Sequence, residues 1–82
     1  MVIAKVTIEL KKGVADPEGM NTKKTLNLLG WDVKGVKSGK IFEIDLGDDL
    51  TKEDAREEVE EMCKRLLANP VIQTYDIEII EG

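Results

Sequence analysis

Hydrophobic and polar positions alternate strictly in the first part of the chain. Across residues 2–11 one face of an extended chain would carry Val2, Ala4, Val6, Ile8 and Leu10. A period of two with β-branched residues predicts a strand. The same period recurs over residues 40–46 and 71–80, and a shorter extended stretch over Val33–Ser38 predicts a fourth strand with Val36 facing inward.

Two segments between these strands carry helical signals. The first helix is expected to begin at Asp16-Pro17, because Asp caps free amides and Pro suits the first helical position. It should end at Gly30. Gly19 in its first turn weakens a helix by up to about 1 kcal/mol relative to Ala, so we expect another backbone to approach there. Its semi-apolar stripe is Thr22, Thr25, Leu26 and Leu29.

The second helix is expected to begin at Thr51, in a variant of the capping box that has Asp54 at the third position. Its buried stripe would be Ala55, Val59, Met62, Cys63 and Leu66. Asn69-Pro70 should stop it, since a residue that precedes proline is disfavoured in the α region.

The order βαββαβ predicts an α+β, ferredoxin-like two-layer sandwich: a four-stranded antiparallel sheet with both helices on one face. Val33–Ser38 and Lys40–Leu46 would form a hairpin through a tight turn at Ser38-Gly39. The 82 residues allow a single domain, 1–82. We call the uncovered sheet face the open face and expect it to be a partly buried self-association surface, because isoleucines lie among its charges: Ile3, Lys5, Thr7, Glu9, Ile41, Glu43, Asp45, Ile72, Thr74, Asp76, Glu78 and Ile80.

Composition removes several chemistries. The chain has no His and one Cys, which excludes the commonest general base, an internal disulfide and multi-cysteine metal sites. The free thiol and the lack of a signal peptide or long apolar run indicate a cytoplasmic protein that spans no membrane. The net charge of −5 makes nucleic-acid binding a poor expectation. The bias toward Lys and Glu hints at a thermophilic source.

No constellation of catalytic groups can be assembled from the remaining candidates. The acidic residues between Glu53 and Glu61 are expected to form a solvated helix face. The segment Gly35–Lys40 lacks the spacing of a phosphate-binding loop, and Cys63 is expected to be a buried structural thiol. Trp31 is either a lid on the first helix or an interface anchor. Asp16 is expected to act as a helix cap.

Four segments at their present spacing carry a family resemblance: Gly13-Val-Ala-Asp16-Pro17-Glu-Gly19, Leu26-x-x-Leu29-Gly30-Trp31, Gly39-Lys40 before Ile41-Phe42-Glu43-Ile44, and Cys63–Ile72 before Tyr75-Asp76-Ile77-Glu78. Together they resemble the PurS family, small subunits of phosphoribosylformylglycinamidine synthase. The resemblance runs from about Ala4 to Glu78, and Trp31 stands where Tyr or Phe is more usual.

The resemblance implies a non-catalytic subunit of an ATP-dependent, glutamine-amidotransferring ligase at the fourth step of purine biosynthesis. It would form a dimer or tetramer, bridge a glutaminase subunit and a large synthetase subunit, and support ammonia transfer between them. No cofactor is expected in this chain, because ATP and Mg would bind the large subunit. The alternative is a regulatory, small-molecule-binding domain of ferredoxin-like fold, and a metallochaperone of that fold would need a C-x-x-C that is missing.

We expect partner or oligomer contacts at three segments and on the open face. The segments are the Asp16–Gly19 loop, the Ser38–Lys40 turn and the Asn69–Ile72 corner. The candidate contact residues are Asp16, Pro17, Gly19, Trp31, Gly39, Lys40, Asn69, Pro70, Ile3, Ile41, Ile72 and Ile80. A helix cap and a helix stop would explain the Asp16 and Asn69-Pro70 positions on structural grounds alone.

Overall fold

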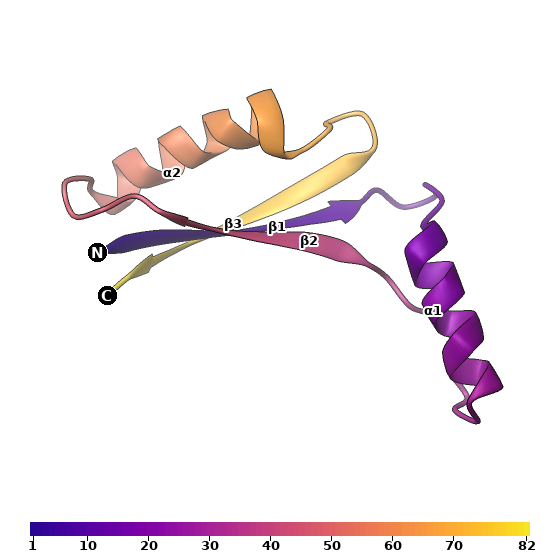
Figure 1. Ribbon diagram of the computed structural model, residues 1–82. Coiled ribbons are helices and arrows are strands. Elements are labelled where there is room, and N and C mark those ends of the chain that lie inside the picture. The colour runs from indigo at the N-terminus through magenta and orange to yellow at the C-terminus, as the bar shows by residue number, and fades with distance from the viewer.

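A computed structural model describes residues 1–82 (Figure 1). The strands β1 (Val2–Leu10), β2 (Gly39–Asp45) and β3 (Gln73–Glu81) form an antiparallel sheet in the order β2-β1-β3. Helix α1 (Pro17–Leu28) follows β1, and α2 (Lys52–Met62) follows β2. A π-helical turn, η1 (Cys63–Leu67), extends α2 and closes with a bond from the Ala68 N–H to the Cys63 carbonyl.

Strand register sorts the side chains between the two faces of the sheet. Val6 of β1 lies opposite Phe42 of β2 and Ile77 of β3. Residues directly opposite each other in an antiparallel pair project from the same face. These three side chains therefore share the core face, and Lys5, with its partners Glu43 and Glu78, lies on the open face. The predicted division of strand residues between the faces is confirmed.

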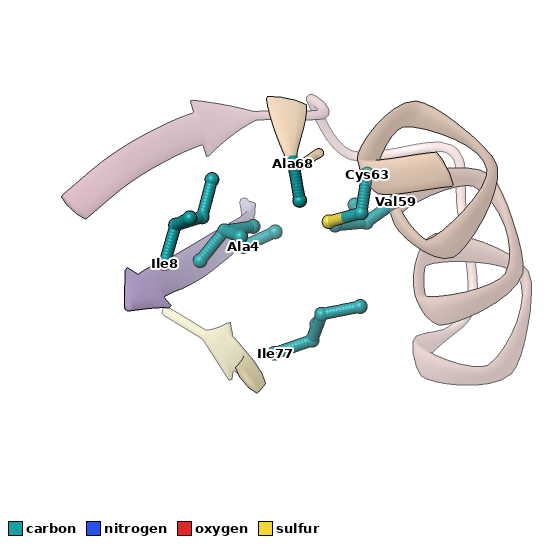
Figure 2. Packing of buried hydrophobic residues seen from close by; sticks show 7 residues of the cluster. Ala4, Ile8, Val59, Cys63, Ala68 and Ile77 are labelled. Atoms are coloured by element: carbon teal, nitrogen blue, oxygen red, sulfur yellow. The ribbon is translucent and has the colours of Figure 1, made fainter. Parts of the chain in front are cut away.

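Helix α2 covers the core face above β1 and β3 (Figure 1). Ala55, Val59 and Cys63 are fully buried along the side of the helix that faces the sheet. Val59 and Cys63 pack against Ala4, Val6, Ile8, Ala68 and Ile77, and Figure 2 shows this small cluster. The buried stripe predicted for this helix is confirmed at Ala55, Val59 and Cys63. Of the other two predicted residues, Leu66 is exposed and Met62 is half-buried.

The predicted four-stranded, ferredoxin-like sheet with both helices on one face is wrong. The sheet has three strands, and α1 points away from it (Figure 1). Residues 33–38 pair with no strand and instead return along α1, where the Val33 N–H donates to the Asn27 side chain at 2.8 Å. The hairpin turn does not form, because the Ser38 N–H bonds the Asp16 carboxylate and Gly39 begins β2 opposite Glu9.

The semi-apolar stripe predicted for α1 is not buried either. Thr22, Thr25 and Leu29 are exposed, Leu26 is half-buried, and Gly19 is the helix's buried residue. We call residues 12–38 the arm, since α1 and its return segment leave the sheet together.

The arm makes the chain far from compact. Its radius of gyration is 16.1 Å, whereas a compact domain of this length has one of about 12 Å. The accessible surface is 6193 Å², against about 4,900 Å² for a folded monomer of this mass. The excess of about 1,300 Å² is surface that a self-contained domain would have buried.

Candidate functional site

The arm is attached to the sheet by the carboxylate of Asp16. One oxygen accepts hydrogen bonds from the Gly19 N–H (2.9 Å) and the Ser38 hydroxyl (2.7 Å). The other accepts from the Ser38 N–H at 2.8 Å. We call this set of bonds the latch. It joins the start of α1 to the residue just before β2, so both ends of the arm are tied at one point.

The latch sets the electrostatics of Asp16. The Ser38 hydroxyl, the Ser38 N–H and the Gly19 N–H all stabilise the charged carboxylate, so they lower the pKa of Asp16 below its usual range. With three donors already bound, this carboxylate is poorly suited to accept a substrate's proton. The predicted capping role of Asp16 is confirmed, and the latch to Ser38 adds a second, long-range role.

Gly19 lies beneath the return segment of the arm. An ideal Cβ at this position would lie 2.5 Å from the Val36 carbonyl oxygen and 2.6 Å from Oδ2 of Asp16. No side chain fits in that space, so the expectation that another backbone approaches Gly19 is confirmed.

The three predicted contact segments lie together at one end of the sheet. β1 ends there, β2 begins at Gly39 beside the latch, and β3 begins at Gln73 opposite Leu10. The Asn69–Ile72 corner joins this end because the Lys11 N–H bonds the Ile72 carbonyl at 2.8 Å. A hollow of about 230 Å³ lies between them, lined by Ile8, Leu10, Asp16, Pro17, Glu18, Ser38, Gly39, Lys40 and Gln73.

The corner is held by its own hydrogen bonds. The Asn69 carbonyl accepts a hydrogen bond from the Gln73 N–H at 2.7 Å. The Asn69 side-chain oxygen accepts another from the Val71 N–H at 3.0 Å. Val71 is exposed, and Pro70 follows the end of η1 as a helix stop should. This geometry accounts for Asn69-Pro70 as a local turn without reference to a partner.

The remaining candidates lie elsewhere. Trp31 is 60% exposed in the loop after α1, so it does not form a closed lid. On the open face, Ile3 lies opposite Ile80, whereas Ile41 lies opposite Thr7 nearer the other end. The isoleucines therefore form separate apolar spots among charges.

The groups that could have supported chemistry are not arranged for it. Cys63 is fully buried, and this burial raises the pKa of its thiol, so the reactive thiolate is disfavoured. The acidic residues of α2 lie mainly at the surface, where Glu61 pairs with Arg65 at 3.2 Å. No three potential ligand side chains converge as a metal site, and neither helix is long and apolar enough to cross a membrane.

Comparison with known proteins places the chain in a family. Residues 3–81 match the PurS family, described as phosphoribosylformylglycinamidine (FGAM) synthase. The PurS subunit of this synthase from Archaeoglobus fulgidus is 56% identical over 93% of this chain and 95% of the relative. The corresponding subunit from Methanocaldococcus jannaschii is 49% identical over 96% and 95% of the two chains.

Solved structures agree with the sequence matches. The crystal structure of Methanocaldococcus jannaschii PurS, one of the subunits of formylglycinamide ribonucleotide amidotransferase in the purine biosynthetic pathway, has a TM-score of 0.90 at 47% identity and covers 100% of this chain and 99% of its own. A chain in the structure of PurLQS from Thermotoga maritima has a TM-score of 0.83 at 27% identity, over 98% of this chain and 99% of its own. The family resemblance found in the sequence is confirmed: this chain belongs to the PurS family and is a non-catalytic subunit of phosphoribosylformylglycinamidine synthase, an enzyme of purine biosynthesis.

Proposed function

We propose that the chain works as a bridge within that synthase, linking a glutaminase subunit to a large synthetase subunit and supporting ammonia transfer between them. The observation that carries the proposal is the match to a chain of the PurLQS structure over nearly the whole length of both. A chain of this kind has no need of reactive groups of its own, since the chemistry would lie on its partners. ATP and Mg would then bind the large subunit, and the complex would work in the cytoplasm.

The shape of the chain supports a bridging role. Residues 12–38 carry five lysines against three acids, so the arm has a net charge of +2 and the rest of the chain one of −7. Two surfaces of opposite charge suit two different partners, because electrostatic complementarity speeds correct association and disfavours wrong partners. The end of the sheet at Asp16, Gly39, Lys40 and Asn69 lies between these surfaces and is the proposed contact region.

Assembly of purified proteins tests the bridge. The chain is mixed with the glutaminase and the synthetase subunits, and the mass of the products is measured by light scattering after size exclusion. We expect a complex of all three components to form only when this chain is present. A glutaminase–synthetase complex that forms equally well without it would contradict the proposal.

We further propose that the chain self-associates as a dimer or tetramer, with the open face as one contact. Ile80 is 42% exposed beside Ile3, although isoleucine is among the residues most often buried. Replacing both with Lys should reduce the number of copies in the assembly. Glu53→Gln with Glu57→Gln is a matched control, because it raises the net charge by the same two units at exposed positions of α2. An assembly of unchanged mass in Ile3→Lys/Ile80→Lys would exclude this face as a contact.

A further inference from the structure

We propose that the corner where η1 meets the Asn69–Ile72 turn docks another subunit of the synthase, with Leu66 as the side chain that this partner buries. The partner surface would be an apolar hollow edged by carboxylates. The inference rests on the bridging role proposed above and specifies one of the contacts that a bridge needs.

The π-helical turn decides which leucine faces the sheet. Each residue of an α-helix turns by about 100°, so a regular helix would place Leu66 only about 20° from the direction of Ala55, in the middle of the buried stripe. The helix widens at η1 instead, where the Ala68 N–H bonds the Cys63 carbonyl at 3.0 Å. As a result Leu67 packs on the core, and Leu66 is 82% exposed.

The exposure of Leu66 is built into the packed part of the fold. Figure 2 shows Cys63 and Ala68, which lie on either side of the turn, pointing into the core cluster. Leucine is among the residues most often buried. A π-helix is rare, and it occurs mainly as a single turn, frequently at functional sites. The turn therefore presents a leucine to a partner at a fixed position.

The residues after η1 extend this apolar surface. Val71 is 77% and Ile72 37% exposed. The Asn69 side chain holds the Val71 N–H at 3.0 Å, and the Lys11 N–H bonds the Ile72 carbonyl at 2.8 Å. In Figure 1 the connection from η1 to β3 bows outward at the end of the sheet where the arm begins. We call Leu66, Val71 and Ile72 the corner patch.

The border of the corner patch is basic, although the chain has a net charge of −5. Residues 62–75 carry two cations and no acid, and two lysines adjoin Ile72 at the end of β1. The four cations, all exposed, are Lys11, Lys12, Lys64 and Arg65. Arg65 already pairs with Glu61 at 3.2 Å, which leaves the three lysines for a partner. Carboxylates around an apolar hollow would complement this border and speed association.

A second copy of this chain does not fit the corner patch. In a two-fold contact the patch would meet itself, which brings the cations of both borders together. The most acidic surface of the chain is the outer face of α2. Residues 52–61 have no exposed apolar side chain that Leu66 could join. The occupant we infer is therefore a different protein of the synthase.

Binding to the separate subunits tests the corner patch. Leu66→Ala and Leu66→Met are titrated by calorimetry into the glutaminase subunit and into the large synthetase subunit, each alone and with the other present. Ala removes the apolar contact, whereas Met keeps it. Lys64→Gln removes one border charge. Lys52→Gln is its matched control, because it removes the same charge at an exposed position at the other end of α2.

We expect Leu66→Ala to weaken binding to one of the two subunits by roughly ten- to a hundredfold, as the loss of a buried leucine should. Leu66→Met should bind like the parent. Lys64→Gln should weaken binding at low salt and less at high salt, and Lys52→Gln should not. All four variants should unfold at the parent's midpoint, because the changed side chains are exposed.

Four results would overturn the inference. Equal affinity of Leu66→Ala and the parent for both subunits would do so and leave the bridge standing. A lowered unfolding midpoint in Leu66→Ala would show that this leucine serves the fold instead. A smaller self-associated mass of Leu66→Ala in light scattering would assign the patch to a second copy. A parent chain that binds neither subunit would overturn the bridge and the inference together.

Discussion

Replacing Gly19 with Ala is expected to loosen the arm without unfolding the sheet. The added Cβ would lie 2.5 Å from the Val36 carbonyl oxygen, about 1 Å inside ordinary contact. The return segment or the first turn of α1 must therefore shift. Overpacking of this kind costs about 1–3 kcal/mol, whereas Ala in place of Gly in a helix gains up to about 1 kcal/mol. Because the clashing atom belongs to the backbone and cannot rotate aside, the upper end of that cost applies, and the net destabilisation should be about 2 kcal/mol.

Hydrogen exchange and thermal unfolding together measure this effect. Amide exchange should accelerate at Ser38 and in the first turn of α1, while the amides of β1 keep their protection. The midpoint of unfolding should fall by roughly 4–8 °C per kcal/mol if the arm unfolds with the rest. Gly35→Ala is the matched control, because its Cβ meets no atom within 4 Å and its stability should be unchanged or slightly raised. A Gly19→Ala chain as stable as the parent, with unchanged exchange at Ser38, would refute the reasoning.

Three further predictions concern the core, the latch and the thiol. Val59→Ala should destabilise the chain by about 1–3 kcal/mol in denaturant unfolding, because a fully buried side chain leaves a cavity against β1; a loss near zero would contradict the packing. The pKa of Asp16 is lowered in the folded chain, so the latch should be fully formed above about pH 4, the ordinary pKa of Asp. It should be lost as the pH falls through the lowered pKa of the folded chain. The NMR shift of the Ser38 amide should therefore titrate with a midpoint below the ordinary Asp value, and a midpoint at or above it would contradict this. Cys63 should react with a thiol reagent only after unfolding, and rapid labelling of the native chain would show that the site opens.

The elements that could be predicted from the sequence are those whose partners lie within the chain. The alternating pattern predicted β1 correctly because the core side chains of this strand pack beneath α2. The apolar stripe predicted α2 correctly because Ala55, Val59 and Cys63 are all buried against the sheet. In both cases the hydrophobic pattern and the burial arise from the same contacts, so one predicts the other.

The prediction of a fourth strand was wrong because a hydrophobic pattern indicates a preference for strand structure but does not identify a pairing partner. Residues 33–38 form no strand, and the bonds from Ser38 to Asp16 hold the end of this segment beside the start of α1. Those bonds join residues 22 apart in the chain, and no local spacing signals them. By contrast, Gly19 gave a usable signal, since a glycine in a helix's first turn indicates that something else occupies the space of a side chain.

The candidate contact residues could be predicted as separate positions in the sequence, but not as one surface. Asp16, Gly39 and Asn69 lie far apart in the sequence, and the strand topology brings them to one end of the sheet. That convergence depends on the antiparallel register of three strands, which turn chemistry alone does not determine. It also places three of the family segments, at Asp16–Gly19, Gly39-Lys40 and Asn69–Ile72, next to the base of the arm.

The most direct test of the account compares two nitrogen sources in the reconstituted synthase. The glutaminase and synthetase subunits are assayed for formylglycinamidine ribonucleotide synthesis with glutamine and with free ammonia, each with and without this chain. A bridge that supports ammonia transfer should raise the glutamine-dependent rate strongly and leave the ammonia-dependent rate nearly unchanged. A full glutamine-dependent rate in its absence would contradict the account.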